Sequence, residues 1–185
     1  RFSSFSQTAM KALLSSYEPK FINITINAGY IPRDHWTQDR AIGGGRLIGE
    51  ACHFIDLSKY LISKKITKYD IEKMTHDTFS FRLIFEDDSI SVINYVACGH
   101  KSYPKEKIEI FYENKTILID NFRRIRTWGL DTNINKRNFF QDKGNESCVA
   151  SFVDTISRNS PPLIPIKDIL ETTDISIKLS NEIFD

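Results

Sequence analysis

GGGRLIGEACHFIDL, residues 43–57, is the stretch from which the rest of the chain can be interpreted. Apolar residues in it and just beyond recur at spacings of three, four and seven, the pattern of an amphipathic helix with one face on a core. This stripe consists of Leu47, Ala51, Phe54, Ile55, Leu61 and Ile62. We therefore expect a helix from the glycines to about Ser63.

A second face of the same helix carries the groups that can do chemistry. At about 100° per residue, Glu50 and His53 lie about 60° apart and Arg46 sits nearly above His53. The preceding glycines allow close backbone approach, and free N–H groups at a helix start favour an anion, so the pattern predicts a site for proton transfer. A flexible glycine entry and an ordinary Glu50–His53 surface pair, worth a few tenths of a kcal/mol, explain the same residues. Periodicity alone leaves both interpretations open.

Two polar loops lie outside this helix. Residues 30–42, YIPRDHWTQDRAI, come directly before the glycines, and residues 99–107, GHKSYPKEK, follow a predicted strand. Their polar, basic and aromatic side chains are suited to lining a ligand pocket or meeting a phosphate or carboxylate. Loops are polar by default, however, so solvated segments are the competing interpretation for both.

Alternating apolar residues predict a sheet on either side of the helix. The strand candidates are residues 21–26, 66–76, 78–86, 89–99, 106–114 and 116–122, with 123–129 extending the sheet. Short turns join most of them, which favours antiparallel pairing. The clearest candidate, 78–86, places Phe79, Phe81, Leu83 and Phe85 on one face.

Helical patterns occupy both ends of the chain. Residues 1–17 have a capping residue at Ser6 and inward positions at Ala9, Leu13 and Leu14. Residues 146–156 carry the stripe Val149, Ala150, Phe152, Val153 and Ile156, and residues 166–184 place Ile169, Leu170, Thr173, Ile177 and Ile183 inward. Residues 131–142 show no period and are expected to form a loop. The prediction is an α+β fold, an open and mostly antiparallel sheet of about six strands with helices on one face.

Composition narrows the class of protein. With 185 residues, 41% hydrophobic and 26% charged, the chain is expected to be a single soluble domain. The 25 basic and 24 acidic residues leave a net charge of +1, so neither a nucleic acid nor a membrane is an expected partner. Without an apolar run near the roughly 20 residues that span a bilayer, or a signal core, a cytoplasmic location is expected. Cys52, Cys98 and Cys148 form no CxxC pair, so reduced thiols and no metal site are expected.

The dinucleotide fingerprint GxGxxG, the phosphate-binding lysine loop, HExxH and the Gly-x-Ser-x-Gly elbow are all missing from the sequence. Residues 43–56 nevertheless resemble the substrate domain of the glucose-fructose oxidoreductase and inositol dehydrogenase family, often written Gfo/Idh/MocA. The shared pattern is a triple glycine, a short apolar spacer, an Asp, three residues, a His and a further Asp in the same helix. The segments RFSS, NAGYIPRDHW, DKGNESCVASFVDTI and SPPLIPIKDILETT resemble other parts of that domain in the right order.

The combination of NAGY, HW, GGGRLIGEACHFIDL and GHKSYPKEK is most similar to the bi-domain oxidoreductase branch, whose members often occur with bacterial surface-polysaccharide genes. The resemblance implies a two-domain enzyme that acts on a hydroxyl of a sugar, sugar nucleotide or cyclitol. An upstream Rossmann domain, not part of this chain, would bind NAD or NADP and supply a lysine. Residues 1–185 would form one substrate-binding domain, inactive by itself, that forms a homo-oligomer through the open sheet face.

The resemblance also implies roles for particular residues. His53 matches the family histidine, which exchanges the hydroxyl proton. The family Asp falls at Gly49, and Glu50 is the nearest carboxylate, so we expect His53 and Glu50 to be the catalytic pair. The glycines expected to contact the cofactor are Gly43, Gly44 and Gly45. The residues expected to contact the substrate are Arg33, His35, Trp36, Arg46 and Lys101.

Two alternatives are left open. A non-catalytic module would dimerise or bind a partner through its open sheet face, and would have no pocket near the glycines. A hydrolase would use Glu50 and His53 as acid and base, and would need a second carboxylate across a cleft, for which Asp39 is the nearby candidate.

Overall fold

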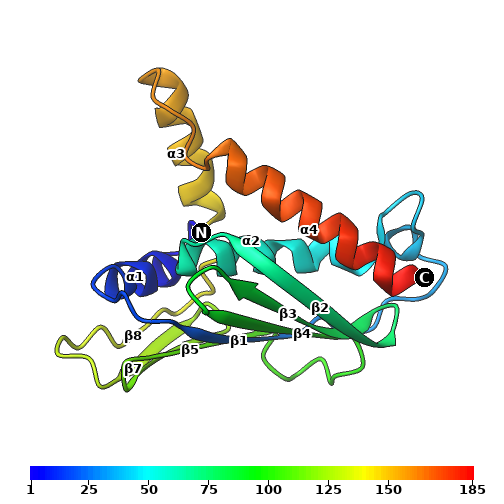
Figure 1. The fold of residues 1–185 in the computed structure, drawn as a ribbon, viewed down its shortest axis with the longest axis horizontal. Coiled ribbons are helices and arrows are strands. Elements are labelled where there is room, and N and C mark those ends of the chain that lie inside the picture. Colours follow the sequence, from blue (N-terminus) through cyan, green and yellow to red (C-terminus); the bar gives the residue numbers. More distant parts are fainter.

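One open sheet runs through the computed structural model, which describes every residue from Arg1 to Asp185 (Figure 1). The strands are β1 (Phe21–Asn27), β2 (Ile66–Thr75), β3 (Thr78–Phe85), β4 (Ile90–Val96), β5 (Glu106–Tyr112), β6 (Lys115–Asp120), β7 (Arg124–Trp128) and β8 (Lys136–Arg137). Their order in the sheet is β2-β3-β4-β1-β5-β6-β7-β8.

Six of the seven neighbouring strand pairs are antiparallel, which confirms the predicted sheet type. The exception is the parallel pair of β1 and β4, which the chain connects through a helix and the β2–β3 hairpin. The sheet has eight strands rather than about six. Asn121 and Phe122 turn the chain at positive φ, so β7 is a strand of its own, and two residues of the predicted loop 131–142 pair with β7 as β8.

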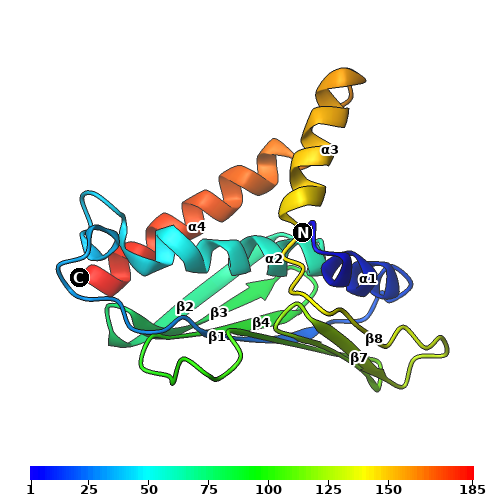
Figure 2. The same ribbon diagram turned by 180° about the vertical axis from the view of Figure 1, so that it is seen from behind.

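Four α-helices accompany the sheet: α1 (Ser4–Leu13), α2 (Cys52–Ile62), α3 (Asn145–Ser157) and α4 (Ile166–Phe184). A 3₁₀ turn η1 (Trp36–Gln38) and a π-helical turn η2 (Leu47–Ala51) complete the helical elements. Helices α1, α2 and α4 lie over one face of the sheet, and in neither view does a helix lie on the opposite face (Figures 1 and 2). Helix α3 stands away from the sheet (Figure 1).

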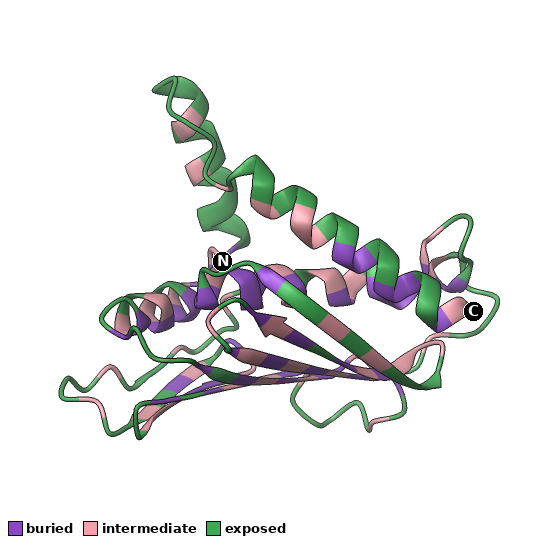
Figure 3. Cartoon of the chain, in the orientation of Figure 1, coloured by how far each residue is buried: buried purple, intermediate pink, exposed green.

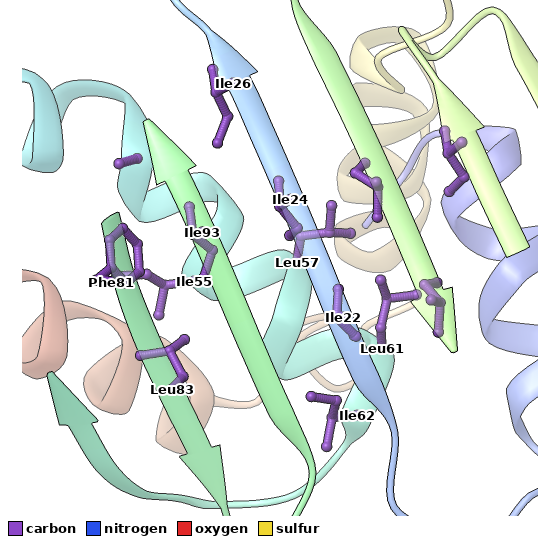
Figure 4. Close-up of a cluster of buried hydrophobic side chains, with 14 of the residues drawn as sticks. Ile22, Ile24, Ile26, Ile55, Leu57, Leu61, Ile62, Phe81, Leu83 and Ile93 are labelled. Carbon is purple, nitrogen blue, oxygen red and sulfur yellow. The ribbon is translucent and has the colours of Figure 1, made fainter. Parts of the chain in front are cut away.

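The core lies between α2 and the middle of the sheet. From α2, the side chain of Leu61 lies beside Ile22 of β1 and that of Ile55 lies beside Ile93 of β4, and these four are at most 1% exposed (Figure 4). Each side chain buried in this way contributes about 1.5 to 3 kcal/mol relative to exposure. The predicted apolar faces of α2 and β3 are therefore confirmed as core.

The first helix begins earlier than the sequence predicted. Ser3, and not Ser6, is the cap: its hydroxyl accepts a hydrogen bond from the N–H of Phe5 at 3.3 Å. Ser6 lies inside the helix and is buried, and Leu14 follows the last turn with 65% exposure. The inward stripe starts at Phe5, one turn before the predicted one.

The two closing helices contradict the predicted inward faces. No residue of α3 is buried, and the predicted stripe from Val149 to Ile156 faces solvent (Figure 3). On α4, Ile183 is buried as predicted, but Ile169, Leu170, Thr173 and Ile177 are exposed. The helix instead buries Ile175, Ser176, Leu179, Ser180 and Ile183. An amphipathic pattern cannot show which of two apolar stripes meets the core.

Candidate active site

The backbone conformation and close packing ahead of α2 require glycine at all three positions. Gly44 and Gly45 have φ of 71° and 74°, which favours glycine. A Cβ on Gly43 would lie 2.5 Å from the carbonyl oxygen of Trp36. The N–H groups of Gly43 and Gly44 donate to the carbonyl oxygen of Asp39 at 2.8 and 3.1 Å. These two N–H groups are therefore used within the chain, and a cofactor contact at the glycines stays a prediction.

The π-helical turn η2 changes the geometry that a regular helix would give. Leu47 and Ala51 of this turn are buried in the core, and Glu50 is half-buried at the edge of the helix. Single π turns inside helices are frequent at functional sites. Gly49, where the family pattern has Asp, is exposed, and a Cβ there would meet only the Gly43 carbonyl oxygen at 4.0 Å. The backbone thus has room for a side chain at this position.

Glu50 is held from three sides. Its Oε2 accepts a short hydrogen bond from the hydroxyl of Tyr95 on β4, and the guanidinium of Arg46 lies 3.4 Å from the same oxygen. Arg46 also donates from Nε to the Tyr95 hydroxyl at 2.7 Å. On the other side, Nζ of Lys105 lies 3.7 Å from Oε1 of Glu50. The carboxylate is therefore fixed in position by the fold.

These contacts keep Glu50 ionised. Partial burial opposes the charge, but the Tyr95 hydrogen bond and the charges of Arg46 and Lys105 outweigh it, so the pKa of Glu50 lies below its ordinary value. Burial and the neighbouring Glu50 raise the pKa of Tyr95, which therefore stays a hydrogen-bond donor. At neutral pH Glu50 can accept a proton or a hydrogen bond, but it carries no proton to donate.

Glu50 and His53 line the same hollow, whose volume is about 500 Å³. This volume lies within the usual range of about 300 to 1,000 Å³ for small-molecule pockets. The His53 side chain is exposed at the hollow and forms no hydrogen bond within the chain. The structure therefore brings together the two residues that the sequence predicted as a catalytic pair.

The other polar side chains that line this hollow were not among the predicted site residues, and they include Lys105, Glu106 and Lys143. Glu106 is only 3% exposed, and its carboxylate binds Nζ of Lys143 at 2.7 Å and Nε2 of Gln141 at 3.2 Å. Lys105 lies in the predicted basic loop, four residues after Lys101. Lys143 comes from the segment before α3, over 35 residues further along, and only the tertiary fold places it here.

Tyr95 was also missed, although its position carries a signal. It alternates with Ser91 and Ile93 on the buried face of β4, where a hydroxyl needs a partner. A tyrosine at such a position predicts a buried polar contact. The sequence could not show that this contact is with Arg46 and Glu50.

The predicted substrate residues lie elsewhere. Arg46 is 3% exposed and supports Glu50 from behind. Arg33, His35 and Trp36 are exposed in the loop before η2 and do not line the hollow, and neither does Lys101. His35 bonds to Thr37 of its own loop at 2.8 Å. Direct substrate contacts by these residues stay predictions.

The carboxylate that the hydrolase alternative requires is engaged elsewhere. Oδ1 of Asp39 accepts hydrogen bonds from the N–H groups of Ala41 and Ile42 at 2.7 and 3.0 Å, and Asp39 does not line the hollow. Glu106 does line it, but its two oxygens are bound by Lys143 and Gln141. Neither carboxylate is free to face Glu50 as its catalytic partner.

Asp56, the last acidic residue of the motif, has a structural partner. Arg1 binds its carboxylate with both Nε and a terminal nitrogen, at 2.7 and 2.6 Å. Burial raises the pKa of the neighbouring Cys52 thiol, which donates a hydrogen bond to the Ile48 carbonyl oxygen at 3.0 Å.

No group of three His, Cys, Asp or Glu side chains is placed to hold a metal ion. None of the helices has the length and apolar character needed to cross a bilayer.

Comparison with known proteins gives matches in structure only. No protein-family model and no curated protein matches the sequence. An aldose-aldose oxidoreductase from Caulobacter crescentus is 15% identical with a TM-score of 0.75, and the match covers 99% of this chain and 59% of that one. The UDP-N-acetylglucosamine 3-dehydrogenase GnnA from Acidithiobacillus ferrooxidans is 10% identical with a TM-score of 0.72, covering 94% and 56%.

A third solved structure is GenD2 from gentamicin A biosynthesis in complex with NAD, 13% identical, with a TM-score of 0.71 and coverage of 98% and 58%. The chain thus spans less than three fifths of the length of these three proteins. At such identities the likeness establishes the fold alone. The chain has the fold of the carboxy-terminal domains of Gfo/Idh/MocA-type oxidoreductases, as the sequence resemblance implied.

Proposed function

We propose that this chain is the substrate domain of an NAD- or NADP-dependent oxidoreductase that acts on a hydroxyl of a sugar, sugar nucleotide or cyclitol. The observation that carries the proposal is the shared hollow of His53 and Glu50, about 500 Å³ in volume, in which Glu50 is held as a carboxylate. The named activities of the neighbours, on aldoses and on UDP-N-acetylglucosamine, support this substrate class.

Oxidation of an alcohol removes a hydride from carbon and a proton from oxygen. A bound nicotinamide supplies the hydride acceptor. His53, exposed at the hollow, accepts the hydroxyl proton and becomes an imidazolium. Glu50 is placed to accept a hydrogen bond from a second hydroxyl or to stabilise the developing positive charge, and the cations of Lys105 and Lys143 are placed to donate to substrate oxygens.

The chain by itself offers little to a dinucleotide. The N–H groups of Gly43 and Gly44 are bonded to Asp39, and a Cβ on Gly45 would meet the ring of Phe184 at 2.8 Å, so the triple glycine forms no open cradle for a pyrophosphate. We infer that a Rossmann domain preceding Arg1 in the full-length protein holds most of the cofactor. The 185 residues alone are then expected to turn over no substrate.

The test replaces the proposed proton acceptor in the full-length protein. His53→Ala should lower kcat by about 10² to 10⁴, the usual contribution of a general acid or base. Turnover is followed by nicotinamide absorbance with a panel of sugars, sugar nucleotides and cyclitols. His100→Ala is the matched control, because His100 lies in an exposed loop outside the hollow. Wild-type turnover by His53→Ala would contradict the assignment.

We further propose that the full-length protein forms a homo-oligomer through the bare face of the sheet. Phe21, Phe111 and Trp128 are 42%, 41% and 50% exposed, and the strand register places them on this face. The rings of Phe21 and Phe111 are 6.4 Å apart. Phe111→Asp should therefore lower the sedimentation coefficient to that of a monomer. A wild-type protein that is monomeric at micromolar concentration would contradict this proposal.

A further inference from the structure

The densest positive charge outside the proposed active site lies at the β8 edge of the sheet, in residues 121–137. This stretch contains five basic residues, and Asp131 is its only acidic residue. The basic residues are Arg123 before β7, Arg124 and Arg126 in β7, and Lys136 and Arg137, which together form β8. The whole chain has a net charge of +1, so this excess of positive charge is local.

Three of the arginines line one small hollow, which we call the arginine hollow. Its volume is about 210 Å³, and it is lined by Pro104, Asp120, Asn121, Arg123, Arg124 and Arg137. Asp120 is the one carboxylate in this lining, and it binds Arg124 at 2.6 Å. Arg123 and Arg137 therefore have no carboxylate partner in the hollow.

The strand register brings two of these positive charges together. Arg124 of β7 lies directly opposite Arg137 of β8. Like charges at directly opposite positions of an antiparallel pair repel each other and destabilise the sheet. The other residue pair that joins these strands is Ile125 with Lys136, so the repulsive pair is half of the contact between β7 and β8. An anion bound between the two guanidinium groups would offset this repulsion.

Arg123 reaches the same hollow from the turn between β6 and β7. One of its terminal nitrogens donates a hydrogen bond to the carbonyl oxygen of Phe139 at 2.8 Å, which ties this turn to the chain just after β8. Both Arg123 and Arg137 are exposed. The N–H groups of three guanidinium groups are thus available on different sides of one concave surface.

Protection of the sheet edge is a competing explanation for the charges, because charged side chains on an edge strand prevent pairing with another chain. Lys136 of β8 is exposed and meets that need without lining the arginine hollow. Edge protection requires charges along the strand, but it does not require three guanidinium groups around one hollow.

We propose that the arginine hollow binds a phosphate group. Guanidinium groups bind phosphate through two parallel N–H···O bonds, and several of them together neutralise its double charge. A volume of about 210 Å³ is below the range of about 300 to 1,000 Å³ for pockets that enclose a whole small molecule. The ligand is therefore a free phosphate or the phosphate end of a larger molecule.

The arginine hollow adjoins the proposed active site. Pro104 and Asn121 line the arginine hollow, and the residues that follow them, Lys105 and Phe122, line the hollow of Glu50 and His53. A shallow surface hollow of about 790 Å³ also contains both Arg137 and Lys143, and Lys143 lines the active hollow. A phosphate carried by a substrate in the active hollow thus has a path to the arginines. The proposal also holds for a free phosphate, so it does not depend on the proposed function.

The test is a calorimetric titration of the full-length protein with inorganic phosphate, at low salt and with saturating NAD to occupy a nucleotide-binding domain. Arg137→Ala should weaken phosphate binding by more than about tenfold, because a charge and its paired donors are lost. The matched control is Lys136→Ala, which removes the same charge from the same strand outside the hollow. This control should change the affinity by less than about twofold, because a distant exposed charge is screened.

Melting temperatures give a second measure of the same site. Phosphate should raise the melting temperature of the wild type and of Lys136→Ala but not that of Arg137→Ala, because a ligand stabilises only a folded state that binds it. Wild-type protein without saturable phosphate binding would overturn the proposal. Equal weakening by Arg137→Ala and Lys136→Ala would also overturn it, because the attraction would then be non-specific.

Uridine diphosphate, which lacks the adenine of NAD, distinguishes the two sources of the phosphate group. Competition between inorganic phosphate and uridine diphosphate, with both weakened by Arg137→Ala, would support the proposal and assign the group to a nucleotide. Phosphate binding that depends on Arg137 but is unaffected by uridine diphosphate would support it with a free anion as the ligand. These measurements need no turnover, so they remain valid if the proposed activity fails.

Discussion

Helices α2 and α3 have apolar stripes with the same spacing and opposite surroundings. In α2, Ile55 and Leu61 are 0% and 1% exposed against the sheet, whereas in α3 Phe152 and Val153 are 62% and 55% exposed. The hydrophobic effect favours covering both stripes. The difference is that the sheet covers the stripe of α2, whereas the stripe of α3 is exposed in these 185 residues.

The two helices also differ in what their surroundings do for chemistry. Helix α2 is fixed on a packed core, so the turn before it can hold Glu50 in one position between Tyr95 and Lys105. Helix α3 rises from the rim of the same hollow with no packing of its own. The core therefore preorganises the side of the site that carries Glu50, whereas the side at α3 has no buried contact that would fix it.

The largest expected difference between α2 and α3 is in how much their apolar side chains contribute to the free energy of unfolding. Leu61→Ala should lower the free energy of unfolding by about 3 to 5 kcal/mol, because it leaves a cavity in a closely packed core. Val153→Ala should change the stability of the 185-residue chain by less than about 0.5 kcal/mol, because the side chain contacts mainly water. Urea unfolding of the two variants measures both values. Equal losses would mean that α3 is packed in solution after all.

A smaller difference in the free energy of unfolding is expected between a buried and an exposed ion pair on α4. Glu171 accepts a hydrogen bond from Ile66 N–H at 2.7 Å and binds Nζ of Lys59, which is 8% exposed, at 2.5 Å. Glu171→Ala should cost about 2 to 3 kcal/mol, because the N–H of Ile66 loses its acceptor and the buried Lys59 ammonium, which keeps the Lys64 carbonyl oxygen, loses its nearest carboxylate.

The exposed pair of Asp174 and Lys178, 2.7 Å apart, serves as the comparison. Asp174→Ala should cost no more than about 0.5 kcal/mol. Denaturant unfolding of both variants at low and high salt checks the contrast, and an Asp174→Ala loss as large as that of Glu171→Ala would refute it.

The smallest expected effect concerns the preorganised side of the site. Tyr95→Phe should cost about 1 to 2 kcal/mol, since Arg46 Nε loses a buried acceptor and Glu50 loses a donor. The pKa of Glu50 is held below its ordinary value of 4.5, so its ionised form stabilises the fold above pH 4.5, and this contribution is lost as pH falls through the folded pKa. The side chain is 37% exposed, which keeps this share small.

The gap between wild type and Tyr95→Phe should therefore narrow as pH falls below 4.5. Urea unfolding at a series of pH values measures the gap. A gap that is independent of pH would show that Tyr95 does not act on the Glu50 carboxylate.

Local sequence patterns predicted the fold correctly wherever a residue's contacts are with segments nearby in the sequence, or wherever the pattern repeats along a strand. The alternation in 78–86 placed Phe79, Phe81, Leu83 and Phe85 in the core, and short turns predicted the mainly antiparallel pairing. The strand that was missed, β8, is short and polar, and its pairing depends on the neighbouring strand rather than on its own sequence. Strand β7 lies within residues 123–129, which were predicted to extend the sheet.

The residues of the candidate site also divide into those that local spacing predicted and those that only the tertiary fold brings together. The spacing of Glu50 and His53 placed both on one side of a helix, and the structure confirms that they share a hollow. The supporting residues Tyr95, Lys105 and Lys143 come from three other segments, so no spacing rule connects them to Glu50. Arg46 was predicted to contact the substrate, whereas its side chain is buried and donates to Tyr95 of β4.

The sequence by itself determined that the chain contains amphipathic helices, alternating strands and a glycine entry to a helix that carries Glu50 and His53. These properties depend on side chains a few positions apart, whose geometry the backbone fixes. Only the tertiary structure decided which apolar stripe is core and which is bare, and which charges surround Glu50. Those choices depend on contacts between segments more than 100 residues apart, such as Lys59 with Glu171, and the free energy of burial does not depend on where in the sequence the covering surface comes from.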